Sequence, residues 1–371
     1  MGSAAVLDLE SLLRPIPGEQ AAGIDLRQDQ SASPIYYRIK DVRSAARAAE
    51  RQGEFESVIG PAEANAWRPI LGLATEALGG QSKDLELVAW LIEALARTHG
   101  FAGLRDGFLV AKGLVETCWD GLYPRPDEDG LETRIAPLTG LNGAGAEGTL
   151  CAPISRIPIT QGSSASPVAA WNCAQAIELE RQPDKKADRI AAGATSMDQV
   201  QAAVRETPPA FFVELVADID AALAALAALG KALDARCGSQ APPLSAIRGA
   251  IENAATMVRH VARDVLPAPE AAGGAGEPAP SATPRGADAP AGAGAPSGPI
   301  RSREDAFRLL GSVAEYFRRA EPHSPIAFLI ERTIRWGRMP LPELLAELIP
   351  DEGARSTFGQ LTGVLINPPA E

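Results

Sequence analysis

The sequence has few of the residues that usually build disulfides, metal centres or active sites. Among 371 residues there are only four cysteines and three histidines. The cysteines are far apart and form no C-x-x-C pair, so reduced thiols are the simpler interpretation, which favours the cytoplasm. The histidines are too scattered for a local zinc motif, although a pairing of His260 with Cys237 in space stays open. These residues are Cys118, Cys151, Cys173, Cys237, His99, His260 and His323.

Long apolar runs and an excess of basic residues are also absent. Nowhere do about 18 apolar residues follow one another, and no early segment has the pattern of a cleaved signal peptide. The net charge of -12 and the pI of about 4.9 disfavour tight binding to nucleic acid or anionic lipid, which requires surplus Lys and Arg. With 46% hydrophobic residues, the chain can still bury large cores. We expect a folded cytoplasmic protein without membrane insertion.

Motifs of catalysis and cofactor binding are weak. No G-x-S-x-G or other nucleophile signature occurs, and Ser324 is better explained as a helix cap before a proline. Residues 143–148 match G-x-G-x-x-G, but no apolar strand precedes them and Pro153 prevents a long helix after them. Glu147 would also repel a phosphate. We therefore expect no cofactor, no metal site and no enzymatic activity.

One stretch, residues 119–130, gathers four acidic side chains, two prolines and two aromatic residues. Aligned to an EF-hand calcium loop, it would place Arg125 first and Ala136 twelfth, so both end ligands are missing. Such a proline- and glycine-rich stretch is also too wet to raise the pKa of a catalytic carboxyl group. We interpret it as a solvated loop that closes a helical domain, with Asp127 and Asp129 as candidate contacts for a partner.

Composition divides the chain into parts. Residues 267–299 consist mainly of Ala, Pro and Gly and contain no Val, Ile, Leu, Met or aromatic residue, so they should form a flexible tether. Its typical span is on the order of 30 Å. We predict an N-terminal helical domain at 1–150, a connector and middle helical domain at 151–266, and a small C-terminal helical domain at 300–371.

Apolar residues at steps of three and four predict an all-α fold. The Ser33-Pro34 pair and a capping box from Ser196 to Gln199 mark two helix starts. Repeated prolines over residues 124–167 instead favour an extended connector. Before the tether, the predicted helices cover residues 34–51, 64–78, 83–98, 104–119, 168–180, 197–206, 209–236 and 245–265, the last two as a hairpin.

Beyond the tether, three amphipathic helices are predicted near residues 303–320, 325–336 and 342–349. A core of this size often needs oligomerisation for stability. Trp and Arg are common interface anchors, although Trp336 is equally compatible with the core. The candidate subunit contacts are Trp336, Arg335, Arg338 and His323. The predicted core residues are Leu309, Leu310, Val313, Phe317, Leu329, Ile330, Leu344 and Leu348.

Seven charged residues of the N-terminal part are expected to form internal ion pairs that brace the helices, with partner binding as the alternative. They are Asp25, Arg27, Asp41, Arg43, Lys83, Asp84 and Glu86.

Several short motifs occur in order along the chain. In the N-terminal part they are LLRPIPGE at 12–19, AGIDLR at 22–27, YRIKDVR at 37–43, QSKDLE at 81–86, AWLIEAL at 89–95, GFAGL at 100–104, WDGLYP at 119–124 and DEDG at 127–130. Beyond the tether they are residues 302–306, 316–319, 321–325 and 339–345. The N-terminal motifs resemble the TssA (ImpA) family of type VI secretion proteins, and those beyond the tether are similar to the C-terminal domain of its shorter members. Residues 168–266 carry no such motif.

The resemblance implies a non-enzymatic component of the injection machine that contacts baseplate, sheath, tube and spike proteins. It also implies that the C-terminal part assembles into a ring. We therefore expect an all-α, cytoplasmic assembly factor that forms a homo-oligomer through residues 300–371 and presents tethered N-terminal domains to sheath and baseplate. Two alternatives stay open: a monomeric adaptor and, less favoured, a hydrolase associated with the same machine.

Overall fold

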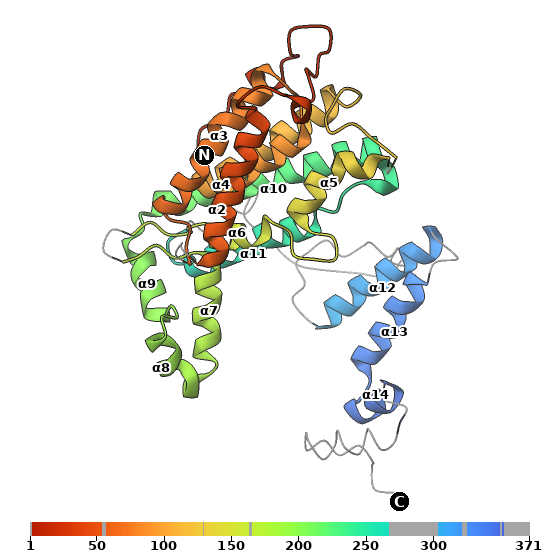
Figure 1. Cartoon of the computed structure of the whole chain (residues 1–371). Coiled ribbons are helices and arrows are strands. Elements are labelled where there is room, and N and C mark those ends of the chain that lie inside the picture. The colour runs from red at the N-terminus through yellow and green to blue at the C-terminus, as the bar shows by residue number, and fades with distance from the viewer. Residues whose placement is uncertain are drawn as a thin grey trace, which may run out of the picture. The chain divides into compact units, whose positions relative to one another are not determined.

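The computed structural model describes residues 2–53, 57–128, 130–162, 165–266, 303–320, 325–348 and 351. Within these ranges the secondary structure consists of fourteen α-helices and two short 3-10 helices, without a β-strand, so the predicted all-α fold is confirmed. The chain separates into two compact units, residues 1–274 and 275–371. Figure 1 shows the helices of each unit.

The described part of the first unit contains eleven α-helices and two 3-10 helices. The α-helices are α1 (Leu9–Leu13), α2 (Ile35–Gln52), α3 (Pro61–Gly80), α4 (Leu85–Thr117), α5 (Leu131–Asn142), α6 (Cys151–Arg156), α7 (Ala170–Glu180), α8 (Pro183–Ala191), α9 (Met197–Glu206), α10 (Pro209–Cys237) and α11 (Ser245–Val261). The 3-10 helices are η1 (Leu26–Gln28) and η2 (Gly238–Gln240).

Helix α4 forms the centre of the first unit. It packs against α3 on one side and along α10 on another, and most of its side chains are buried. The sequence predicted two helices separated near Gly100. The structure shows one element interrupted at Gly100, whose φ of 55° and ψ of -133° are accessible mainly to glycine. The break was therefore predicted correctly: two largely buried helical halves meet at a kink.

The hydrophobic core of the first unit is continuous from Leu7 to Ala262. The predicted hairpin of α10 and α11 is present, and these helices pack against α4 and α6 respectively. Residues 151–266 thus share a core with residues 1–150. A domain boundary at residue 150 stays a prediction, and this packing gives it no support. Figure 1 shows α7, α8 and α9 projecting from the layer of α2, α3 and α4.

The prediction of an extended connector at 124–167 was wrong, because α5 and α6 lie within it. In α5, Ile135, Leu138 and Leu141 follow a helical spacing and are buried. Pro137 is accommodated inside this helix, so burial of one apolar face outweighs the loss of one backbone hydrogen bond. In the described part of this region, the Asp127–Gly130 and Pro158–Ala169 bridges have extended pairing.

Helix starts were predicted with mixed success. The capping box of α9 is confirmed: the Gln199 amide donates to Ser196 Oγ at 3.2 Å, and the Ser196 amide donates to Gln199 Oε1 at 2.8 Å. At α2 the cap position is Pro34 and no side chain caps the helix, so the predicted capping role of Ser33 was wrong. Helices α1 and α8, which are short, were not predicted.

The second unit contains α12 (Arg303–Ala320), α13 (Ile326–Arg338) and α14 (Leu341–Leu348), close to the predicted ranges. Its predicted core was largely wrong for the single chain. Leu309, Val313, Leu329 and Leu348 are exposed, and Leu310, Phe317, Ile330 and Leu344 are only half-buried. The buried apolar residues among the described part of this unit are Ala314, Ala327 and Leu345.

Candidate functional site

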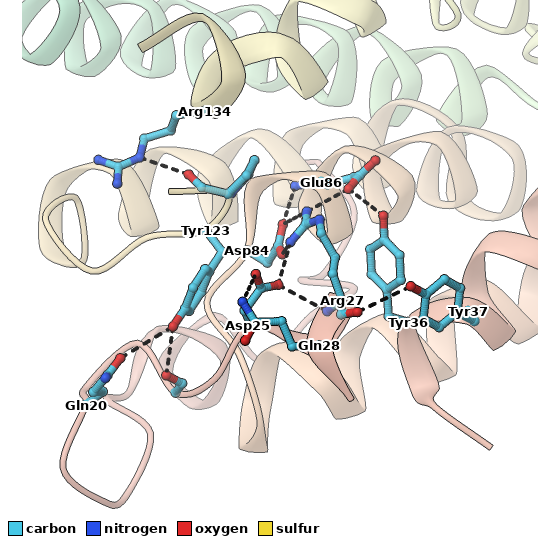
Figure 2. A network of polar contacts seen from close by, with 12 residues as sticks. Gln20, Asp25, Arg27, Gln28, Tyr36, Tyr37, Asp84, Glu86, Tyr123 and Arg134 are labelled. Atoms are coloured by element: carbon cyan, nitrogen blue, oxygen red, sulfur yellow. Dashed lines mark hydrogen bonds and ion pairs between the residues drawn. The ribbon is translucent and has the colours of Figure 1, made fainter. Parts of the chain in front are cut away.

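A compact charged cluster lies where η1 meets the first turns of α2 and α4. Figure 2 shows Asp84 and Glu86 converging on Arg27. The Arg27 guanidinium donates to Asp84 Oδ2 at 2.6 Å, to Asp84 Oδ1 at 3.3 Å and to Glu86 Oε2 at 2.6 Å. Asp25 accepts a further bond at 3.2 Å, and the Tyr36 hydroxyl donates to Glu86 Oε2 at 2.9 Å. One cation therefore joins three segments that are far apart in sequence.

Asp84 has two roles in this cluster. Its side chain accepts a hydrogen bond from the Glu86 amide at 2.7 Å and caps α4. Burial raises the pKa of the Asp84 carboxyl above its ordinary value, although Arg27 opposes this shift. For Arg27, burial favours the neutral form, but Asp84 and Glu86 raise its pKa well above the ordinary value. The carboxylate is thus retained inside the protein mainly through Arg27.

A second charged cluster follows along α2 and α4. Arg43 forms a two-point contact with the buried Glu93, and Arg47 approaches the same carboxylate at 3.6 Å. One turn further along α4, the buried Arg97 contacts Glu50 through two nitrogens and lies 3.9 Å from the centroid of the Trp67 ring. These contacts tie α2 to both α3 and α4.

The expected internal ion pairs are thus present for Asp25, Arg27, Arg43, Asp84 and Glu86, although Glu93 was not foreseen as the partner of Arg43. Two of the seven residues behave differently. Lys83 is completely buried and donates to the carbonyl oxygens of Leu12 and Leu78 at 2.6 and 2.7 Å. Burial lowers its pKa. Asp41 is exposed and makes no ion pair within the described ranges. Its predicted bracing role was wrong.

The acidic stretch closes the α4 region, as its sequence indicated. Trp119, Leu122 and Tyr123 are buried, and the Tyr123 carbonyl accepts from the Leu85 amide at 2.8 Å. The Arg134 guanidinium donates to the Trp119 carbonyl at 2.8 Å and stacks over its ring. Figure 2 shows Tyr123 reaching toward Gln20, with Arg134 on its other side. The aromatic residues therefore anchor this loop to the helices.

The charged groups of this loop remain near water. Asp120, Asp127 and Glu128 are exposed, and Asp127 Oδ1 accepts from the Thr133 hydroxyl at 2.6 Å. Asp129 lies outside the described residues. The hydrogen-bonded, exposed Asp127 lacks the burial that would raise the pKa of a general acid.

The glycine-rich residues 143–148 form a tight turn between α5 and α6. A Cβ atom at Gly143 would lie 2.1 Å from the Ala146 carbonyl oxygen, so glycine is needed for close backbone approach. The buried Asn142 side chain accepts from the amides of Ala246 and Ile247 at 2.9 and 3.1 Å. The turn thus helps to seat the start of α11.

The interaction residues predicted in the second unit lie on α13. Arg335 pairs with Glu347 of α14 at 2.5 Å, and Arg338 pairs with Glu304 of α12 at 2.8 Å. Trp336 is half-buried, with Arg332 4.5 Å above its ring. The two predicted arginines are therefore largely exposed but already linked within their own unit. His323 lies outside the described residues.

The described part of the first unit has a cleft of about 670 Å³ between α3, the α4 break and the start of α10. One of the ionisable side chains that line this cleft is His99, whose pKa is lowered by burial and by the nearby Arg68. The His99 Nδ1 atom lies 2.9 Å from Thr98 Oγ1. At the opposite wall, the Ser3 hydroxyl donates to Glu214 at 3.0 Å. Serine and histidine are thus engaged with different neighbours and form no nucleophile–base pair.

Among the described residues, no group of three or more His, Cys, Asp or Glu side chains is arranged to hold a metal ion. No helix in the same residues combines the length and the apolar character needed to cross a membrane.

The comparisons with known proteins agree with this architecture. The family model for ImpA, N-terminal, type VI secretion system, matches residues 13–143. This range contains both charged clusters of α2 and α4, together with the acidic loop. The fold and this match define the chain as a type VI secretion system component with an ImpA-type N-terminal region.

Similarity to a relative extends over most of the chain. The type VI secretion system component TssA1 of Pseudomonas aeruginosa is 30% identical over 365 residues, covering 93% of this chain and 96% of that protein. The chain belongs to the TssA family. A solved structure of the N-terminal domain of the Burkholderia cenocepacia TssA component, including its conserved ImpA_N region, superimposes with a TM-score of 0.58 and 27% identity. The superposition covers 71% of this chain and 98% of the Burkholderia cenocepacia structure.

Proposed function

We propose that the protein is a non-enzymatic, cytoplasmic assembly factor of the type VI secretion system whose second unit forms a homo-oligomeric ring. The ring would present first units to baseplate, sheath and tube components. The observation that carries the proposal is the exposed apolar surface of the second unit. Its members are Leu309, Val313, Tyr316, Ile326, Phe328, Leu329 and Leu348.

The second unit exposes many large apolar side chains for a unit of its size. Phe328 and Tyr316 are each 66% exposed, and Leu329 is 57% exposed. The described residues of the first unit, although far more numerous, expose only Ile24, Tyr37, Trp171 and Val213 among large hydrophobic side chains. Seven exposed large apolar side chains on so small a helical unit favour burial against another protein surface. Second copies of the same unit are the partner that the family relationship supports.

Three interface residues predicted from sequence lie on α13, which also carries the exposed Phe328 and Leu329. We propose that Trp336 lies in the contact between copies, with Arg335 and Arg338 at its rim. Their ion pairs with Glu347 and Glu304 are solvent-exposed, so exchanging them for contacts with a second copy would cost little. Asp127 remains a proposed contact of the first unit with partner proteins of the machine.

Light scattering on the full chain tests the ring. The wild type is expected to be a defined oligomer at micromolar concentration, whereas Phe328→Glu combined with Leu329→Glu should shift it to a monomer. Both side chains are exposed in the single chain, so the helices should be retained. Trp171→Glu, at a 44%-exposed position of the first unit, is the matched control and should leave the oligomer intact.

A wild-type chain that remains a strict monomer would exclude the ring and favour the monomeric adaptor. An oligomer that survives the double substitution but dissociates with Trp171→Glu would place the contact in the first unit.

A further inference from the structure

Helix α2 is basic although the whole chain is acidic. Its eighteen residues contain five cations and two acids, whereas the chain carries a net charge of -12. Of the two acids, Glu50 is turned toward Arg97 and only Asp41 is exposed. The cations are Arg38, Lys40, Arg43, Arg47 and Arg51. The exposed side of α2 is therefore a local positive surface on an acidic protein.

Three of these cations lie along one edge of the helix. Lys40 and Arg47 are seven residues apart, about two helical turns, and Arg51 follows one turn later, so the three lie on the same face. At a rise of about 1.5 Å per residue they span roughly 16 Å. Lys40 and Arg51 are exposed, and neither forms an ion pair within the described ranges. We call Lys40, Arg47 and Arg51 the basic stripe.

Arg47, in the middle of the basic stripe, is poorly neutralised. Its carboxylate neighbour is Glu93 at 3.6 Å, and Glu93 is already engaged by two nitrogens of Arg43. Burial lowers the pKa of Arg47, and the positive charges of Arg43 and Arg97 lower it further. The carboxylate of Glu93 opposes this shift but does not cancel it. An incoming carboxylate would therefore find a cation that shares its carboxylate partner, Glu93, with Arg43.

An aromatic ring lies at the beginning of the same exposed face. Tyr37 is 42% exposed and is fixed by an edge contact with Tyr36 and by a hydrogen bond from its hydroxyl to the Arg27 carbonyl at 3.3 Å. Its ring offers apolar contact one turn before Lys40. A fixed aromatic residue followed by spaced cations suits a polypeptide with both apolar and acidic side chains.

We infer that the basic stripe and Tyr37 form a docking surface for an acidic helical segment of a partner protein. Carboxylates repeated at four- and seven-residue steps on that segment would face Lys40, Arg47 and Arg51 together. A nucleic acid or anionic membrane is disfavoured because the chain as a whole carries a net charge of -12, and three cations on one helix give few phosphate contacts. This docking surface lies on the first unit. The inference therefore goes beyond the proposed ring, which is formed by the second unit.

Fluorescence anisotropy with the full chain tests the inference. The probe is a labelled helical peptide of about 20 residues with Glu at the spacing of the basic stripe, and its control carries Gln at the same places. Binding of the Glu peptide should exceed that of the Gln peptide at least tenfold, and it should weaken as salt rises from 50 to 200 mM, because the contacts are between exposed charges.

Charge neutralisation then locates the surface. Lys40→Gln, Arg47→Gln and Arg51→Gln together should weaken Glu-peptide binding at least tenfold. Lys185→Gln, Arg189→Gln and Lys231→Gln remove the same charge from exposed positions elsewhere and should change it less than twofold. If the stripe variant loses helicity, the single changes at exposed Lys40 and Arg51 carry the test, each with an expected loss of two- to threefold.

Three results would overturn the inference: equal binding of both peptides, equal losses in the two triple variants, or stripe-dependent binding that is tighter for a single-stranded oligonucleotide or an anionic phosphatidylserine vesicle. Phe328→Glu combined with Leu329→Glu should leave peptide binding per chain unchanged. Failure of the ring can therefore be distinguished from failure of the docking surface.

Discussion

Removing the Arg27 guanidinium should strongly destabilise the first unit. Asp84 is completely buried and receives two bonds from Arg27, at 2.6 and 3.3 Å. In Arg27→Met, the apolar stem is approximately retained, but Asp84 loses its counter-charge and Glu86 loses a bond of 2.6 Å. Removing one partner of a buried ion pair costs roughly 3–5 kcal/mol.

The exposure of Arg27 places the expected loss at the lower end of that range. Its side chain is 24% exposed, so water screens part of the interaction, and we expect a loss of about 3 kcal/mol in the free energy of unfolding. For a unit of this size, the melting temperature should fall by roughly 6–12 °C. Urea denaturation followed by circular dichroism at pH 7 measures the loss, and thermal melting gives an independent value.

The loss should also depend on pH in a defined direction. Burial already raises the pKa of Asp84, and without Arg27 its pKa should rise further. A carboxyl group whose pKa is higher in the folded state stabilises the fold fully below its unfolded pKa, and this contribution is lost as pH rises through the folded value. The stability difference between Arg27→Met and wild type should therefore be largest near neutral pH and decrease toward about pH 4.

Two companion variants separate charge from geometry. Arg27→Lys retains the charge but not the forked contact and should lose less than Arg27→Met. Adding Asp84→Asn to Arg27→Met removes the buried charge and should recover part of the stability. A loss below about 1 kcal/mol in Arg27→Met, or a double variant no more stable than the single one, would refute the reasoning.

Two further predictions concern the first unit. Gly23→Ala should lower the melting temperature by several degrees, because the new Cβ would lie 2.0 Å from the Gln81 carbonyl oxygen and Gly23 has a φ of 73°; an unchanged melting curve would contradict the close approach. Burial raises the pKa of the Cys173 thiol to about 12, so iodoacetamide at pH 8 should alkylate it at least about a hundredfold more slowly in the folded chain than in urea. Mass spectrometry of the peptide that contains Cys173 measures the alkylation rate in the folded and in the unfolded chain. Similar rates would contradict the burial of this thiol.

The helical fold could be predicted where local signals agreed. The apolar spacing of α10 and α12 and the capping box of α9 involve residues close in sequence, and these helices are present near their expected bounds. Prediction failed at α5, where prolines and glycines around residues 124–167 masked the spacing of Ile135, Leu138 and Leu141. Burial against neighbouring helices decides such a case, and burial is not visible from local composition.

The charged cluster was predicted as a set of residues but not as a set of pairs. Asp25, Arg27, Asp84 and Glu86 were expected to brace helices, and they do so around one guanidinium. Lys83, however, adjoins Asp84 in sequence and yet points to two carbonyl groups in the interior. Which of two adjacent charges meets a carboxylate depends on side-chain direction, which is set by tertiary packing.

The sequence by itself determined that this protein is helical, that an Ala-, Pro- and Gly-rich segment divides it, and that its motifs resemble the TssA family. These properties follow from periodicity, composition and short ordered motifs, which are local. Only the tertiary structure decided that α4 and α10 share one core, that Asp84 is buried with Arg27, and that apolar residues predicted as the core of the second unit lie exposed. Burial depends on neighbours that are distant in the chain, and for the second unit those neighbours include, by our proposal, other copies of the protein.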